Sequence, residues 1–110
     1  MEDRFRQLVA EALDGLPGWV RDRLDNVEVI VEDDAPDRNL LGLYEGIPLT
    51  ERGHYTWALP DRITLFRRPI ERAAGHDDES LRRVVAETVI HEVAHHFGIS
   101  DERLNELGRD

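Results

Sequence analysis

Three side chains near the end of the chain have the types and the spacing that a catalytic metal centre requires. His91, Glu92 and His95 form the pattern H-E-x-x-H. On an α-helix, residues four apart lie one turn apart on the same face, so both imidazoles can reach one metal ion. Glu92 is rotated about 100° from His91, which places its carboxylate beside the ion. Zinc lowers the pKa of a bound water toward about 7, and a neighbouring carboxylate can then take its proton.

Two histidines do not complete such a site, so a third ligand is needed. Gly98 permits the chain to reverse after the helix, because glycine adopts backbone conformations that other residues resist. Asp101 can then fold back toward the ion, which gives the pattern H-E-x-x-H-x-x-G-x-x-D. Glu106 is the second choice for this ligand. Asp101 also has a simpler interpretation, as the N-cap of a short helix.

The helix that carries these residues is expected to be internal. From Leu81 to Phe97 the sequence has helical periodicity, and past the first turn it is apolar on nearly all sides. Burying two histidines and a glutamate without a partner would be costly, and a metal ion supplies that partner. We therefore expect His91, His95 and Asp101 to bind zinc, with Glu92 as the general base.

The remaining sequence predicts an α+β fold in a single domain over residues 1–110. Apolar residues recur at helical spacing from Phe5 to Leu16, and Pro17 with Gly18 ends that helix. Alternating apolar residues predict strands farther along the chain. The expected strands are 27–32, 40–44 with a bend at Gly42, 55–57 and 63–66. The other expected helices are 69–74, 101–107 and a long one that starts in the acidic stretch 77–79 and continues through the helical pattern of 81–97.

The motif and its surroundings resemble known metallopeptidases. The pattern over residues 91–101 resembles the metzincin signature, with Asp in place of the last His. The stretches 40–46, 59–70 and 91–108 resemble the small bacterial zincin-like metallopeptidase family, zinc proteases with a matrix-metalloprotease-like domain. This resemblance implies a minimal zincin-like fold, in which a small mixed sheet is backed by helices and crossed by the active helix. It also implies zinc ligands at His91, His95 and Asp101, with the general base at Glu92.

The expected function is therefore zinc-dependent hydrolysis of peptide bonds, with a peptide or protein as substrate. Two alternatives remain open. His91, His95 and Asp101 also match the spacing H-x3-H-x5-H of bacterial rRNA-maturation metalloproteins, which suggests a metal-dependent ribonuclease. Metzincins carry a Met-turn after the zinc motif, whereas the one methionine here is Met1. The lack of a Met-turn suggests a zinc-stabilised binding module without catalysis.

Net charge and composition argue against several classes of binding partner. The net charge of −10 repels phosphate backbones and anionic lipids, which argues against nucleic-acid and membrane partners. The chain has no cysteine, so it has neither disulfides nor thiolate ligands. No stretch is apolar enough to span a membrane, and the first residues lack the apolar core of a secretion signal. These features predict a cytoplasmic protein.

The sequence predicts the roles of other polar residues less specifically. His96 should lie in the core or at its rim, because its side chain points about 100° away from that of His95. Tyr44 and Tyr55 could donate to an oxyanion, but half-buried strand positions are the simpler interpretation. The segment 40–46 is either an internal strand or an edge strand that pairs with an extended peptide.

Overall fold

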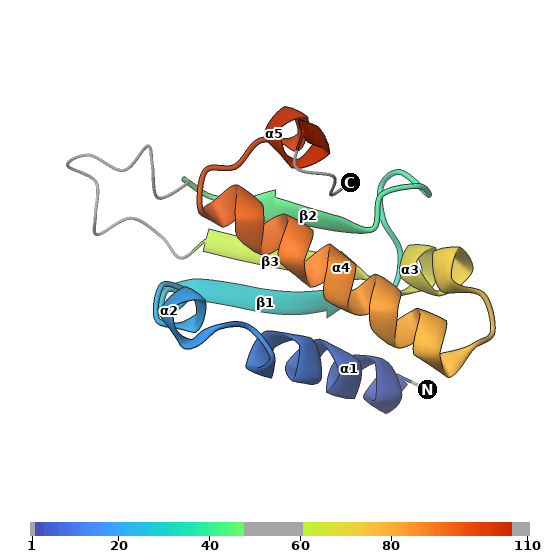
Figure 1. Ribbon diagram of the computed structural model, residues 1–110. Coiled ribbons are helices and arrows are strands. Elements are labelled where there is room, and N and C mark those ends of the chain that lie inside the picture. Colours follow the sequence, from blue (N-terminus) through green and yellow to red (C-terminus); the bar gives the residue numbers. More distant parts are fainter. Residues whose placement is uncertain (1, 48–60, 107–110) are drawn as a thin grey trace.

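Helices pack against a small mixed sheet in the part of the chain that the computed structural model describes, residues 2–47 and 61–106 (Figure 1). This arrangement confirms the predicted α+β class. The elements in chain order are α1 (Glu2–Asp14), α2 (Gly18–Arg21), β1 (Val27–Glu32), β2 (Gly42–Glu45), β3 (Asp61–Phe66), α3 (Arg67–Ala74), α4 (Asp78–His96) and α5 (Asp101–Glu106).

The sheet has the strand order β1-β3-β2. β1 pairs with β3 in parallel, and β2 pairs with β3 antiparallel, so Ile63 of β3 lies between Val29 and Tyr44. The central strand β3 is buried along most of its length, as its apolar sequence requires. Among the described strands β2 therefore lies at an edge, which is the position that an added peptide strand needs.

The helix α4 lies over one face of the sheet, with α1 beside it (Figure 1). Apolar side chains from α1, β3 and α4 meet in the core, which contains Phe5, Leu8, Ile63, Leu65, Val85, Val89 and Val93 among others. None of the described helices is long and apolar enough to span a lipid bilayer.

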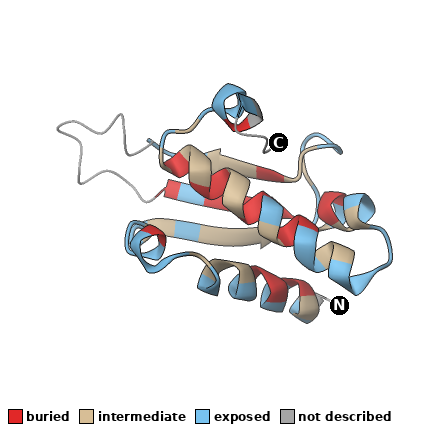
Figure 2. Ribbon diagram, viewed as in Figure 1, coloured by how far each residue is buried: buried red, intermediate tan, exposed pale blue. Residues whose placement is uncertain are grey.

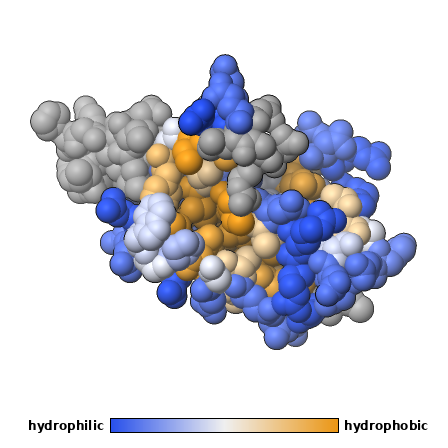
Figure 3. Space-filling view, in the orientation of Figure 1, coloured by the Kyte–Doolittle hydropathy of each residue, from blue (hydrophilic) through white to orange (hydrophobic). Residues whose placement is uncertain are grey.

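The prediction that α4 is internal is correct for one side of the helix. The sheet-facing side is buried, whereas Arg82, Arg83 and Glu87 are exposed and Ile90 is partly exposed (Figure 2). Apolar surface is visible over the centre of this face of the molecule, with hydrophilic residues around it (Figure 3). The apolar sequence of α4 was therefore not sufficient to predict burial on all sides.

α4 begins at Asp78, in the acidic stretch where a new helix was expected to start. The Asp77 carboxylate accepts the Ser80 N–H at 3.1 Å and caps the helix. The short helix α2 was not predicted, because Pro17 and Gly18 were interpreted as a stop; Pro17 instead stands at its N-cap. The predicted strand 55–57 and the end of the last helix at residue 107 lie outside the described residues.

Glycine at position 42 allows β2 and α4 to pack closely. A Cβ atom there would lie 2.9 Å from Cγ2 of Thr88, closer than such atoms approach in proteins. The helix therefore runs directly against the edge strand, and residues of α4 one turn after Thr88 face the same strand.

Candidate metal centre

The last two turns of α4 bring the two motif histidines together. The ring centroids of His91 and His95 are 4.7 Å apart. Oδ1 of Asp101 lies 2.9 Å from Nε2 of His91 and 3.0 Å from Nε2 of His95. One nitrogen or oxygen donor atom from each residue lies within 4.8 Å of the other two. The structure thus gathers the three residues that the sequence singled out as ligands.

Gly98 produces the chain reversal that brings Asp101 back to the helix. Its φ of 88° lies in the left-handed region, where glycine is favoured. The N–H of Gly98 donates to the carbonyl of His95, and the N–H of Ile99 donates to that of Ala94, each at 2.9 Å. This pair of bonds is a Schellman motif, which ends α4 and turns the chain toward α5.

Ser100, and not Asp101, caps the helix α5. The Ser100 hydroxyl accepts the N–H of Arg103 at 3.1 Å, and its carbonyl accepts the N–H of Leu104. The alternative interpretation of Asp101 as an N-cap is therefore wrong, and its carboxylate points at the histidines instead. The role of Ser100 was not predicted, although serine before a short helix is a recognisable capping signal.

The hydrogen bond made by Nδ1 of His95 suits a metal ligand. Its Nδ1 lies 2.9 Å from the carbonyl oxygen of Ile99, which can only accept, so Nδ1 carries the hydrogen. When Nδ1 carries the only ring hydrogen, Nε2 is a lone-pair atom, and it lies 3.0 Å from Oδ1 of Asp101, itself an acceptor. Two acceptors at this distance need a cation or a proton between them. The donor set of two imidazoles and one carboxylate fits zinc, and the hydrogen bond from Nδ1 is the usual outer support of a ligating histidine.

Glu92 lies beside this cluster and is nearly buried, with 5% of its surface exposed. Removal from water raises the pKa of Glu92 above the ordinary value of a glutamate. The neighbouring imidazoles of His91 and His95 oppose this rise, and the carboxylate of Asp101 adds to it. A carboxyl group with a raised pKa is suited to exchanging protons near neutral pH.

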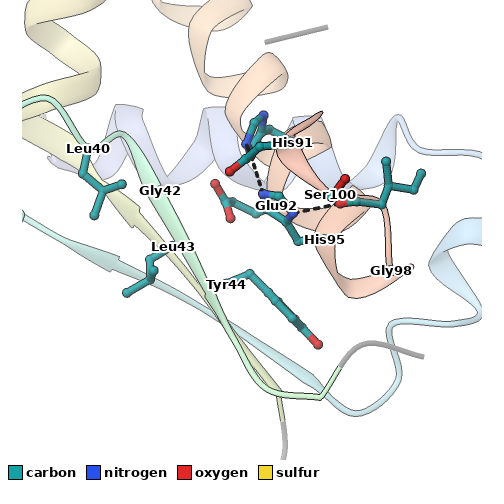
Figure 4. A pocket seen from close by; sticks show the side chains of 11 residues that line it. Leu40, Gly42, Leu43, Tyr44, His91, Glu92, His95, Gly98 and Ser100 are labelled. Atoms are coloured by element: carbon teal, nitrogen blue, oxygen red, sulfur yellow. Dashed lines mark hydrogen bonds and ion pairs between the residues drawn. The ribbon is translucent and has the colours of Figure 1, made fainter. Parts of the chain in front are cut away.

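The cluster opens into a groove between α4 and β2. A cavity of about 450 Å³ includes Leu43 and Tyr44 on one wall, with Glu92 and both histidines on the other (Figure 4). A second cavity of about 440 Å³ adjoins it along the same strand and shares Leu40 and Gly42. The Asp101 side chain is 76% exposed, so the centre faces solvent. The remaining lining residues include Leu41, Ala73, Val84, Thr88, Ile99 and Ser100.

The other residues considered from the sequence take different places. His96 is buried, as expected, and turned away from the cluster. Tyr44 is half-buried in β2, and its hydroxyl donates to Oδ2 of Asp61 at 2.5 Å, so it points away from His91 and His95 (Figure 4). The carboxylate of Glu106 accepts from Arg103 at 2.8 Å and takes no part in the cluster. Tyr55 lies outside the described residues.

Comparisons with known proteins agree with this arrangement. The zincin-like metallopeptidase family matches residues 24–109. No match was found among curated proteins. A solved structure of a conserved hypothetical protein from Thermo thermophilus is similar, with a TM-score of 0.60 and 25% sequence identity over 100% of both chains. The family match indicates metal-dependent peptidase activity and a metal cofactor, typically zinc. The chain, with the His91–Glu92–His95 motif beside its edge strand, belongs to the zincin-like metallopeptidase family.

Proposed function

We propose that this protein is a zinc-dependent peptidase in which His91, His95 and Asp101 hold the metal and Glu92 is the general base. The observation that carries the proposal is the convergence of three donor atoms within 4.8 Å beside a buried carboxylate, at the wall of an open groove. Three protein ligands with access to solvent are typical of catalytic zinc, whereas structural zinc is closed by four.

A zinc ion held there would supply a Lewis acid that polarises a peptide carbonyl and makes water more acidic. The protein's own groups supply the proton transfers. Glu92 takes a proton from the attacking water and passes it to the leaving amine nitrogen. The carbonyl of Ile99 holds the His95 ring in one tautomer, with Nε2 toward the centre.

The edge position of β2 supports an extended peptide as the substrate. A peptide can add to the outer edge of β2 by main-chain hydrogen bonds, which bind any sequence in an extended conformation. The groove beside β2 passes the candidate ligands, so a peptide lying there would bring a main-chain carbonyl to the centre. The net charge of −10 also favours a peptide over a nucleic acid.

The test compares metal content and peptide cleavage in the wild type, Glu92→Gln and Glu79→Gln. Glu79 lies exposed in the first turn of the same helix and serves as the matched control. We expect Glu92→Gln to retain zinc and to lose cleavage by about 10²- to 10⁴-fold, the usual contribution of a general base. Glu79→Gln should cleave as the wild type does. Equal cleavage by all three proteins would reject the mechanism.

The same measurements separate the two alternatives. Zinc binding by a wild type that cleaves no peptide would favour a zinc-stabilised binding module. RNA cleavage that weakens steeply with added salt would favour a ribonuclease, because RNA binding by proteins depends on phosphate contacts.

A further inference from the structure

A second polar cluster lies at the last turn of α4, on a different side of the helix from His91 and His95. It consists of Tyr44 from β2, Asp61 from β3 and His96 from α4, and both Asp61 and His96 are 2% exposed. Oδ2 of Asp61 accepts from the Tyr44 hydroxyl at 2.5 Å and lies 2.8 Å from Nδ1 of His96. We call these three residues the inner cluster.

The inner cluster joins four segments of the chain. Nε2 of His96 faces the carbonyl of Arg23 at 3.0 Å, in the connection that leads to β1. Oδ1 of Asp61 accepts the N–H of Ile47 at 3.4 Å, just after β2. A Cβ at Gly46 would overlap the Asp61 carboxylate, so glycine is needed there for the carboxylate to fit. The end of the helix is therefore tied to both neighbouring strands by polar contacts with defined directions.

The position of His96 in the sequence links the inner cluster to the candidate metal centre. His96 directly follows His95, and consecutive helical side chains point about 100° apart. The contacts that hold the His96 ring against the sheet also fix the rotation of the last helical turn about the helix axis. That rotation determines where the His95 side chain points. Through the turn at Gly98 it also sets the approach of Asp101.

Apolar packing alone does not fix this rotation so closely. The buried side chains of α4 that precede His96 are mainly valines, such as Val89 and Val93, whose contacts with the core have no strong directional preference. Hydrogen bonds weaken steeply with angle. Oδ2 of Asp61 at 2.8 Å and the Tyr44 hydroxyl at 3.3 Å both lie beside Nδ1 of His96, so they hold the ring in one orientation. Tyr44 also belongs to the edge strand, so the same contacts set the distance between β2 and the helix end.

We propose that Asp61, Tyr44 and His96 are positioning residues that set the geometry of the metal centre from beneath α4. The inference rests on the metal ligands of the proposed function, and it assigns a purpose to buried polar groups that the proposed mechanism does not use. Groups that hydrogen-bond a metal ligand directly typically change metal affinity by about 10- to 100-fold when they are altered. The inner cluster acts through the backbone of the last helical turn, so its effect should lie at the lower end of that range. A purely structural cluster would change the stability of the fold and leave the metal centre as it is.

The test uses the full chain loaded with Co²⁺ in place of Zn²⁺, because the visible absorption of cobalt reports ligand geometry. The variants are Asp61→Asn, which keeps the shape of the side chain, and Tyr44→Phe, which keeps the ring and removes the hydroxyl. Val85→Ala is the control, since Val85 is a fully buried core residue of the same helix that lines neither groove cavity. Affinity is measured by competition with a chromogenic chelator, and folding by circular dichroism.

We expect Asp61→Asn to weaken Co²⁺ binding by about 10-fold, the lower end of the range for groups around a metal ligand, and to alter the cobalt spectrum. Tyr44→Phe should also weaken Co²⁺ binding and alter the spectrum, by a smaller amount. If Asp61→Asn does not fold, the result for Tyr44→Phe decides whether the inner cluster positions the metal centre. Val85→Ala should lower the unfolding temperature while keeping affinity and spectrum unchanged at temperatures where it is folded. Folded Asp61→Asn and Tyr44→Phe proteins with wild-type affinity and spectrum would overturn the proposal.

These readouts do not depend on peptide cleavage. A wild type that binds Co²⁺ and cleaves nothing would reject the proposed peptidase, while the changed spectra of the variants would still support positioning. A wild type that cleaves peptides, with variants unchanged in metal binding, would reject positioning alone.

Discussion

Gly42 of β2 faces Glu92 of α4 so closely that a Cβ at position 42 would lie 3.1 Å from Oε2 of the glutamate. The candidate general base is thus held against the backbone of the strand proposed to bind the peptide. This contact buries the Glu92 carboxylate, and burial is the main cause of its raised pKa. The edge strand therefore contributes to the acid–base properties of the site as well as to its shape.

Substitution of Gly42 by alanine should damage both stability and activity. The added methyl group would press on Thr88 and Glu92, and overpacking of this kind costs about 1–3 kcal/mol. Gly18→Ala is the control, because no atom lies within 4 Å of a Cβ placed there. Denaturant unfolding and peptide cleavage measure the two effects. A Gly42→Ala protein as active and as stable as Gly18→Ala would show that β2 and α4 are not in close contact.

Metal removal should lower the stability of the wild type and not that of Asp101→Asn. A ligand that binds the folded state stabilises it by about 2.7 kcal/mol when its free concentration is 100 times its Kd. Asn at position 101 loses the charged donor of the cluster, so little of this stabilisation should remain. Thermal unfolding with zinc and with a chelator measures the difference. Glu102→Gln, at the exposed neighbouring position, should respond to the chelator as the wild type does; an equal response by Asp101→Asn would exclude Asp101 as a ligand.

Loss of the Ser100 cap should weaken metal binding as well as the fold. Ser100→Ala removes the hydroxyl that accepts the Arg103 N–H, at a cost of about 1 kcal/mol, and loosens the turn of α5 that carries Asp101. Asp77→Ala removes the corresponding cap of α4, far from the cluster along the helix, and provides a matched comparison. Both should unfold more easily, but Ser100→Ala alone should bind zinc less tightly. Equal zinc affinity in the two variants would contradict the role assigned to Ser100.

The raised pKa of Glu92 predicts a pH dependence for the metal-free protein. Because the folded state favours the protonated carboxyl, this group adds stability below the pKa of an unfolded glutamate, about 4.3. That stability is lost as the pH rises through the higher pKa of the folded state. Glu92→Gln carries no titrating group there, so in chelator it should become more stable than the wild type as the pH rises toward neutrality. Glu79→Gln should follow the wild-type curve, and parallel curves for wild type and Glu92→Gln would refute the shift.

The parts of the site that are local in sequence could be predicted, and the parts that depend on strand order could not. The spacing of His91 and His95 and the glycine before Asp101 specify a helix and a turn within a few residues. The burial of Asp61 against His96 joins positions 35 residues apart. Residue types alone do not indicate that Asp61 is paired with His96. The edge position of β2 likewise follows from its pairing with β3, which residue types alone do not encode.

The candidate donors all come from one uninterrupted stretch, His91 to Asp101, which spans eleven residues. Closing so short a loop around an ion sacrifices little chain entropy, and each doubling of loop length would add only about 0.6 kcal/mol. The proposed metal site is therefore concentrated in a single small segment. The sheet and the remaining helices are left to hold that segment rigid and to build the wall opposite it.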